Sequence, residues 1–204
     1  VTAYAIIGLT TARENGFAVD LDVILRAEDF LESQFRAITP QMAGWQLDRQ
    51  VFMLYALAYA GGPDVARMDQ HYDSRERLSI YAKALLATAF DMAAAPGMGD
   101  TRADTLLSDI VNDAITSANG IHWEETGRDF WNWNTDTRTT SMVLQTMVRM
   151  MPDSDLIPNV VRWLMVARTA DSWQTTQEMA WAVMALADWM LVSGDLNPVY
   201  DYGL

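Results

Sequence analysis

The chain has 204 residues, half of them apolar, which is enough for one domain with a sizeable buried core. Its net charge is −13, from 27 acidic and 14 basic residues, so its surface repels phosphate backbones and no nucleic-acid partner is expected. The absence of cysteine excludes disulfides, thiol catalysis and thiolate metal sites, and two histidines, His71 and His122, argue against a histidine-based metal cluster. No apolar run approaches the ~20 residues that span a bilayer, so no membrane insertion is expected.

Apolar residues recur at helical spacing along almost the whole chain. Residues that end helices stand between these segments: Gly16 after the first, Gly61 to Pro63 after the third, and Pro96-Gly97 after the fifth. Asp20 or Asp22 is placed to cap the second. The pattern predicts nine helices, over residues 2–15, 22–35, 47–60, 65–77, 79–94, 101–119, 135–151, 156–168 and 175–193.

The predicted helices alternate in character. The odd-numbered ones are rich in Ala, Met, Leu and Tyr on most faces, whereas the even-numbered ones carry charges such as Arg26, Arg67 and Asp104. A helix that is apolar all round is buried and one with a polar stripe lies outside, which predicts concentric inner and outer layers. The segment 50–58 also resembles 178–187, as a repeated unit would. We therefore predict an all-α fold: an α/α toroid of antiparallel helical hairpins over residues 1–196, forming an incomplete ring, followed by an exit linker at 197–204.

One long segment, Gly120 to Asn134, lacks helical periodicity. It contains three tryptophans, Trp123, Trp131 and Trp133. A loop of this length in a compact domain is often functional, and its aromatic, acidic and histidine side chains would suit sugar binding or hydrolysis. In that alternative, Glu124 and Asp136 act as general acid and base. The favoured interpretation is structural: the tryptophans plug one end of the barrel and the polar groups cap helices.

The two histidines and the start of the last helix receive structural interpretations as well. His122 as a general base needs an orienting partner and a nearby substrate, whereas a structural histidine needs one hydrogen bond, and we favour the second. His71 lies among charges on an outer helix and is expected to be solvated. The segment Ser172 to Glu178 predicts a capping box, with Ser or Thr at the helix start and Gln or Glu three residues later.

Four motifs in a fixed order carry a family resemblance. They are Thr2-Ala3-Tyr4, His122-Trp123-Glu124-Glu125 before Thr139-Thr140-Ser141, Val160-Val161-Arg162-Trp163-Leu164, and Trp173-Gln174-Thr175-Thr176-Gln177-Glu178. Together they resemble the thioester-containing domain of the alpha-macroglobulin family, with the bacterial branch as the best fit, over essentially the whole chain. The sequence departs from the family at Thr169 to Ser172, where glycines are common.

The resemblance implies a toroid of six helical hairpins, of which the nine predicted helices would be the C-terminal part. In the family, the thioester joins a cysteine and a glutamine that lie upstream of the position of Thr2. The histidine that assists acyl transfer in some members also lies upstream of that position. The resemblance therefore implies a chain truncated upstream of the thioester, with no catalytic, cofactor-binding or metal-binding residue of its own.

The function implied by the resemblance is protease trapping, in which an exposed thioester acylates the attacking protease. An activated acyl group survives only while water and amines are excluded, and this chain would supply scaffold for that site without catalysis. The implied partners are neighbouring domains of a parent chain and, through the parent, target proteases, in an extracytoplasmic location. The residues expected to form an interface or to be structural are His122, Trp123, Glu124, Trp131, Trp133, Trp173, Thr176 and Gln177.

Other protein classes share helical toroids. A glycoside hydrolase or carbohydrate-binding domain would use the loop at 120–136, where Glu124, Glu125, Asp129 and Asp136 offer carboxylates. A prenyltransferase or terpene cyclase would need zinc ligands or clustered aspartates, which the sequence lacks, although the segment 41–45 faintly resembles a cyclase repeat. A plain interaction module is the remaining alternative.

Overall fold

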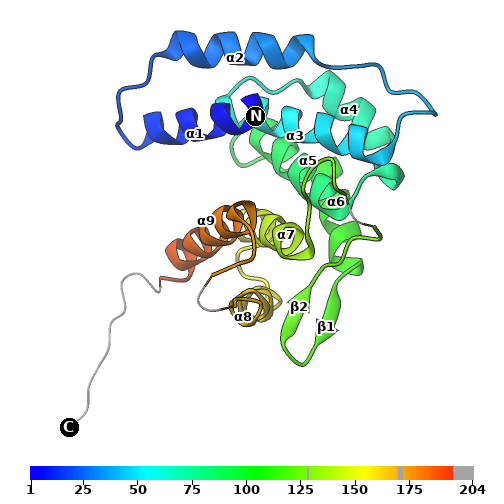
Figure 1. Ribbon diagram of the computed structural model, residues 1–204, viewed down its shortest axis with the longest axis vertical. Coiled ribbons are helices and arrows are strands. Elements are labelled where there is room, and N and C mark those ends of the chain that lie inside the picture. The colour runs from blue at the N-terminus through cyan, green and yellow to red at the C-terminus, as the bar shows by residue number, and fades with distance from the viewer. Residues whose placement is uncertain (128, 170–171, 195–204) are drawn as a thin grey trace. The chain divides into compact units, whose positions relative to one another are not determined.

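The computed structural model describes residues 1–127, 129–169 and 172–194, and the chain divides into two compact units, Val1–Ile110 and Val111–Leu204. In the described part there are nine α-helices, one short 3₁₀ helix and a two-stranded sheet (Figure 1). The predicted all-α class is therefore confirmed. None of the helices in these residues is long and apolar enough to cross a membrane.

The first unit is entirely helical. Its elements are α1 (Thr2–Glu14), α2 (Leu21–Ser33), α3 (Gly44–Ala60), α4 (Val65–Asp73), the 3₁₀ helix η1 (Arg75–Arg77), α5 (Ile80–Ala93) and α6 (Thr101–Asn112), whose last two residues lie past the unit boundary. Helix α3 packs between α1 and α5, and α2 lies along α1 (Figure 1). Fully buried Leu47, Val51 and Leu54 of α3 form the centre of its core.

The helix ends of this unit follow the sequence signals. The carboxylate of Asp20 accepts a hydrogen bond from the amide of Asp22 at 3.0 Å, so Asp20 is the cap of α2. Ser79 caps α5 in the same way. Gly16 and Gly61 have φ angles of +82° and +97°, a backbone region that favours glycine, and both follow helix ends as predicted.

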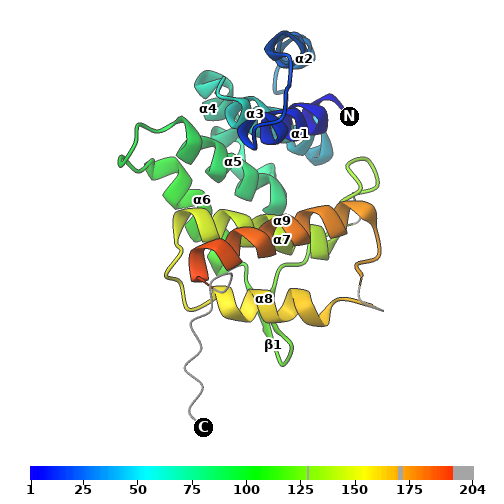
Figure 2. The ribbon, with the colours of Figure 1, turned by 90° about the vertical axis from the view of Figure 1, so that its left-hand side faces the viewer.

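The second unit is a short hairpin followed by three helices. Its elements are β1 (Ile115–Ser117), β2 (Gly120–His122), α7 (Asp136–Met150), α8 (Ile157–Val166) and α9 (Thr176–Ser193). Helix α7 packs against α8 and α9 (Figure 2), and β2 lies against α8 (Figure 1). Trp123, Leu144, Leu164 and Trp181 are buried in the core between them.

The hairpin corrects the predicted helix over 101–119. Helix α6 ends at Asn112, and the following residues pair in antiparallel register, with Ser117 opposite Gly120. Two β-branched residues, Ile115 and Thr116, favour the first strand, and Ala118 and Asn119 form the two-residue turn between the strands. The apolar residues of this segment also fitted the helical periodicity, which hid the hairpin. The predicted helix over 65–77 is also shorter, because α4 stops at Asp73 and a 3₁₀ turn follows.

The predicted distinction between inner and outer helices holds for three of the odd-numbered helices. Helices α3, α5 and α7 are buried on most faces, but α1 and α9 are buried on one side only and expose Tyr4, Val183 and Leu191. Closure of the hairpins into an incomplete ring over 1–196 involves both units and stays a prediction. The expected exit linker at 197–204 lies outside the described residues.

Helix α7 has an unusual interior, because a row of hydroxyl side chains is buried in it: Thr139, Thr140, Ser141 and Thr146. All four hydroxyls have partners. Two bond to the carbonyl one turn earlier in the helix, at 2.7 and 3.0 Å. The other two bond to the segment that precedes α7. A buried hydroxyl is tolerated only when it is hydrogen-bonded, so this row attaches the preceding segment to the helix.

Candidate functional site

The segment between β2 and α7 contains most of the predicted site residues, and a close backbone approach positions it. A β-carbon on Gly120 would lie 2.2 Å from the carbonyl oxygen of Asn159 and 3.0 Å from the backbone nitrogen of Trp163, and the φ angle of Gly120 is +128°. Only glycine fits there. The hairpin therefore lies directly on α8, and the residues after Gly120 are placed by that contact.

His122 stacks on α8. Its ring lies parallel to that of Trp163, with an interplanar angle of 3° and centroids 4.6 Å apart. Its Nε2 is 3.0 Å from Oε1 of Glu124, and the residue is 8% exposed. Both contacts belong to the fold, which is consistent with the structural interpretation of His122.

Trp123 is fully buried and fixed through its backbone. Its amide donates a hydrogen bond to Oγ1 of Thr140 at 3.1 Å, and the same hydroxyl donates to the Trp123 carbonyl at 3.4 Å. The Thr140 side chain of α7 thus satisfies both the backbone N–H and the backbone carbonyl of the buried Trp123. Trp123 is a core residue of the second unit.

Two of the four candidate carboxylates hold the segment to α7. Asp136 accepts a hydrogen bond from the amide of Glu125 at 3.1 Å. The Glu125 side chain in turn accepts one from the Thr139 hydroxyl at 2.8 Å, and the Asn134 amide group joins both residues. The Oδ1 of Asn134 accepts from the buried guanidinium of Arg138 at 2.9 Å. This network accounts for Glu125 and Asp136 as fold-stabilising groups.

Asp129 organises the tip of the segment. One of its carboxylate oxygens accepts hydrogen bonds from the amides of Trp131 and Asn132, both at 3.0 Å, and the other accepts from the Asn132 side chain at 2.7 Å. The backbone amide of Asn134 donates to the Asp129 carbonyl at 3.2 Å, which closes the turn. Sequence reasoning missed this role, although an aspartate that bonds the backbone two residues on is a known turn signal.

The predicted plug of three tryptophans is wrong for two of them. Trp131 is 64% exposed and Trp133 is 74% exposed, and their neighbour Phe130 is 73% exposed. Trp133 is also the only non-glycine with a positive φ angle among the described residues, at 55°. The physical reason is the Asp129 turn, which directs the aromatic side chains to solvent and leaves Trp123 alone in the core.

The start of α9 contains the remaining candidates. Thr175 Oγ1 accepts from the amide of Glu178 at 3.1 Å and the Glu178 carboxylate accepts from the Thr175 amide at 3.0 Å, so the predicted capping box is confirmed. Trp173 is 8% exposed and its indole nitrogen donates to the Leu164 carbonyl at 3.2 Å. Thr176 is exposed and lies in the first turn of α9 with the half-buried Gln177.

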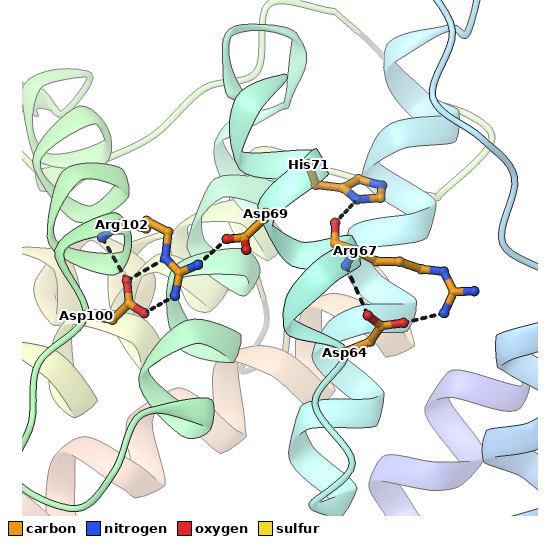
Figure 3. A network of polar contacts seen from close by, with 6 residues as sticks. All are labelled: Asp64, Arg67, Asp69, His71, Asp100 and Arg102. Atoms are coloured by element: carbon orange, nitrogen blue, oxygen red, sulfur yellow. Dashed lines mark hydrogen bonds and ion pairs between the residues drawn. The ribbon is translucent and has the colours of Figure 1, made fainter.

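A polar network in the first unit was not predicted (Figure 3). Arg102 of α6 pairs with Asp69 of α4 and with Asp100, and its guanidinium also lies over the ring of Phe90, 4.1 Å from the centroid. The hydrogen bonds from Arg102 lower the pKa of Asp100 below its usual value. The guanidinium therefore joins α4 to the start of α6.

His71 of α4 belongs to a separate group of contacts with Arg67 (Figure 3), and it corrects another expectation. Instead of being solvated it is 2% exposed, and its Nδ1 donates to the carbonyl of Arg67 at 2.7 Å (Figure 3). Burial lowers the pKa of the His71 imidazole, because the charged form loses its hydration. The reason is that His71 and Met68 lie on the side of α4 that is buried. Within the residues that the structure describes, no group of three His, Asp or Glu side chains is arranged to hold a metal ion.

Comparison with solved structures finds similar folds in several structures of bacterial alpha-2-macroglobulins. The chain superposes on Salmonella alpha-2-macroglobulin reacted with methylamine with a TM-score of 0.71 and 16% identity, over 92% of this chain and 12% of that one. Escherichia coli alpha-2-macroglobulin activated by porcine elastase gives a TM-score of 0.68 and 16% identity, over 90% of this chain and 16% of that one. Native Escherichia coli alpha-2-macroglobulin from domain MG7 to the C-terminus gives a TM-score of 0.66 and 15% identity, over 93% of this chain and 29% of that one.

The chain has the fold of a segment of bacterial alpha-2-macroglobulin. No protein-family model matches it, and the search of curated proteins found no similar sequence. The chain spans between 12% and 29% of the lengths of these alpha-2-macroglobulins. The resemblance inferred from the four sequence motifs is therefore confirmed as a likeness of fold.

Proposed function

We propose that this chain is part of an alpha-macroglobulin-like endopeptidase inhibitor and supplies scaffold for the thioester domain of that protease trap. The observation that carries the proposal is the match over at least 90% of the chain to bacterial alpha-2-macroglobulins, at TM-scores of 0.66 to 0.71. The order of the four motifs supports it independently, because it is a property of the sequence and not of the fold.

In this proposal the chain is not an enzyme. The reactive thioester would belong to a part of the parent protein outside this chain, which has no cysteine. The contribution of these residues would be mechanical. Buried side chains such as Trp123 and Trp173 keep the helices in place, and a rigid wall helps to keep water and amines away from an activated acyl group.

The proposed partners are neighbouring domains of the parent and, through the parent, target proteases, in an extracytoplasmic location. The candidate residues of the second unit divide into a buried and an exposed group. His122, Trp123 and Trp173 are buried. Glu124, Trp131 and Trp133 are exposed. Trp131 and Trp133 belong to the surface group, which is where an interface would lie. Thr176 and Gln177 at the start of α9 are proposed as a second, smaller contact.

The test starts from the gene. The proposal expects coding sequence upstream of Val1 that contains a cysteine, a glutamate and a glutamine within four residues. The full-length product should retain trypsin in a form that cleaves a small chromogenic peptide but not a large protein substrate. Pretreatment with methylamine should abolish covalent capture. A gene without that motif, or a full-length product that leaves trypsin fully active on the large substrate, would overturn the proposal.

The 204-residue chain provides the complementary measurement. On its own it should neither inhibit trypsin or elastase nor hydrolyse oligosaccharides, since the acyl group is absent and Glu125 and Asp136 are engaged in the fold. Saccharide turnover that disappears in the Glu124→Gln variant would instead assign the chain to the hydrolases.

A further inference from the structure

The exposed side of α9 is apolar from its first turn to its last. Four exposed apolar residues at four-residue spacing form one line along the helix, and we refer to them as the α9 stripe: Met179, Val183, Ala187 and Leu191. Met179 is 41% exposed, Val183 53% and Leu191 68%. The opposite side of the helix, which includes Trp181, is buried, and α9 packs along α7 (Figure 2).

Helix α6 provides the contrast, because its exposed side is polar. Its exposed residues at the same four-residue spacing are Asp104, Ser108 and Asn112. A helix side that faces water carries residues of this kind, whereas an apolar side is covered by another element. A contiguous apolar surface such as the α9 stripe therefore marks an interaction site.

The two ionisable residues of α9 are both committed to the fold. Glu178 is buried and closes the capping box with Thr175. Asp188 is half-buried and accepts a hydrogen bond from the Gln145 side chain of α7 at 2.7 Å. The stripe thus presents no charged group that would select a partner of opposite charge, and the surface that covers it has to be apolar as well.

The sizes of the side chains along the stripe are complementary to the same stripe in reverse direction. In an antiparallel pair of α9 helices centred on Ala185, Val183 lies opposite Ala187 of the second copy, and Met179 lies opposite Leu191 of the second copy. The small alanines at the centre allow the two helices to approach closely, and long side chains meet at both ends. A two-fold axis repeats each of these contacts, so one helix supplies both halves of the interface.

The extent of the surface and the charge of the chain set the strength of the association. Helix α9 has 18 residues and is therefore about 27 Å long. One pair of helices of this length buries less than the ~800 Å² per partner of a standard stable interface. The net charge of −13 on each copy opposes association, although salt at physiological concentration screens this repulsion beyond about 8 Å. We therefore expect a weak dimer whose population depends on protein and salt concentration.

We propose that the α9 stripe is a self-association surface, on which a second copy of the chain docks through its own α9 in antiparallel orientation. Val183 and Ala187 form the centre of this contact. The proposal does not depend on a role in protease trapping, because it rests on the surface of one helix.

The test is sedimentation equilibrium of the 204-residue chain from about 10 to about 500 μM, at 150 mM and at 500 mM salt. The wild type should show a monomer–dimer equilibrium, and the higher salt should strengthen it by screening the repulsion. Val183→Asp should weaken dimerisation about tenfold or more, since each dimer would then hold two carboxylates in an apolar contact. Ser108→Asp is the matched control: it adds the same charge to the exposed side of α6 and should dimerise like the wild type.

The antiparallel register has a test of its own, because the chain has no cysteine. An equimolar mixture of Val183→Cys and Ala187→Cys should form a mixed disulfide dimer under mild oxidation, since these two positions face each other. A mixture of Val183→Cys and Leu191→Cys, which lie apart in this register, should form far less of its mixed dimer. Equal yields from the two mixtures would contradict the antiparallel arrangement.

Thermal melts of all variants at low protein concentration should coincide with that of the wild type, since the substituted side chains are exposed. A wild type that stays monomeric over the whole concentration range would overturn the proposal, as would a Val183→Asp variant that dimerises as strongly as the wild type. A monomeric wild type that binds phosphatidylcholine vesicles, with that binding lost in Val183→Asp, would overturn it too and assign the stripe to a membrane surface.

Discussion

Replacing Trp173 with alanine is expected to destabilise the protein far more than removing the helix cap beside it. The indole is 8% exposed and its N–H donates to the Leu164 carbonyl at 3.2 Å, so the change leaves a cavity and an unpaired buried acceptor. A Trp→Ala change in a packed site costs ~3–5 kcal/mol. Thr175→Ala removes one acceptor from the first turn of α9 and should cost about 1 kcal/mol.

Thr176 provides the matched control. It is the adjacent threonine but is exposed and does not cap α9, so Thr176→Ala should change the free energy of unfolding by no more than about 0.5 kcal/mol. Urea titrations followed by circular dichroism measure all three variants under one condition. A Trp173→Ala variant as stable as the wild type, or a Thr176→Ala variant that loses as much stability as Thr175→Ala, would refute this expectation.

Three further predictions concern other positions. Because burial lowers the pKa of His71, the unfolded chain takes up the proton at a higher pH than the folded chain does. The free energy of unfolding should therefore be constant above about pH 7.5 and fall as the pH drops below about 6.5, the pKa of histidine in the unfolded chain. Urea titrations at several pH values should show this fall in the wild type and a smaller one in His71→Gln. Gly120→Ala should lower the free energy of unfolding by about 3 kcal/mol or prevent folding, because its β-carbon would meet the Asn159 carbonyl. Gly127 has open space around it, so Gly127→Ala should leave the stability unchanged in the same urea titrations. The exposed apolar residues of α2 should bind a hydrophobic dye, and Phe30→Asp should reduce that fluorescence; an unchanged signal would locate the dye elsewhere.

The sequence located the helices well because their signals are local. A 3.6-residue periodicity and the glycines after α1 and α3 belong to the elements that they define, and all nine predicted helices are present in the described residues. The error after Asn112 arose because the apolar pattern continued into Ile115, whereas the chain turns at Ala118 and Asn119 and pairs Ser117 with Gly120. The confirmed capping box at Thr175 is likewise a local pattern.

The exposure of side chains was harder to predict because it depends on the path of the backbone. Trp123 and Trp133 have the same side chain and lie ten positions apart, yet one is buried and the other is in solvent. What separates them is the turn at Asp129, and its hydrogen bonds become apparent only in three dimensions. His71 shows the reverse error: charged neighbours in sequence suggested solvent, but its face of α4 points into the core.

The buried hydroxyl row of α7 has a consequence for how the second unit folds. Six of the fifteen residues of α7 are β-branched, which weakens the intrinsic preference for a helix, whereas α9 is rich in alanine, methionine and leucine. An isolated α7 peptide should therefore be largely unstructured in water, and an α9 peptide should show more helix by circular dichroism. In the intact chain α7 would acquire its helical form only as α9 and the Trp123 backbone close around it, although it precedes α9 during synthesis. The central helix of this unit is thus specified by its neighbours, and its formation is coupled to residues that are translated later.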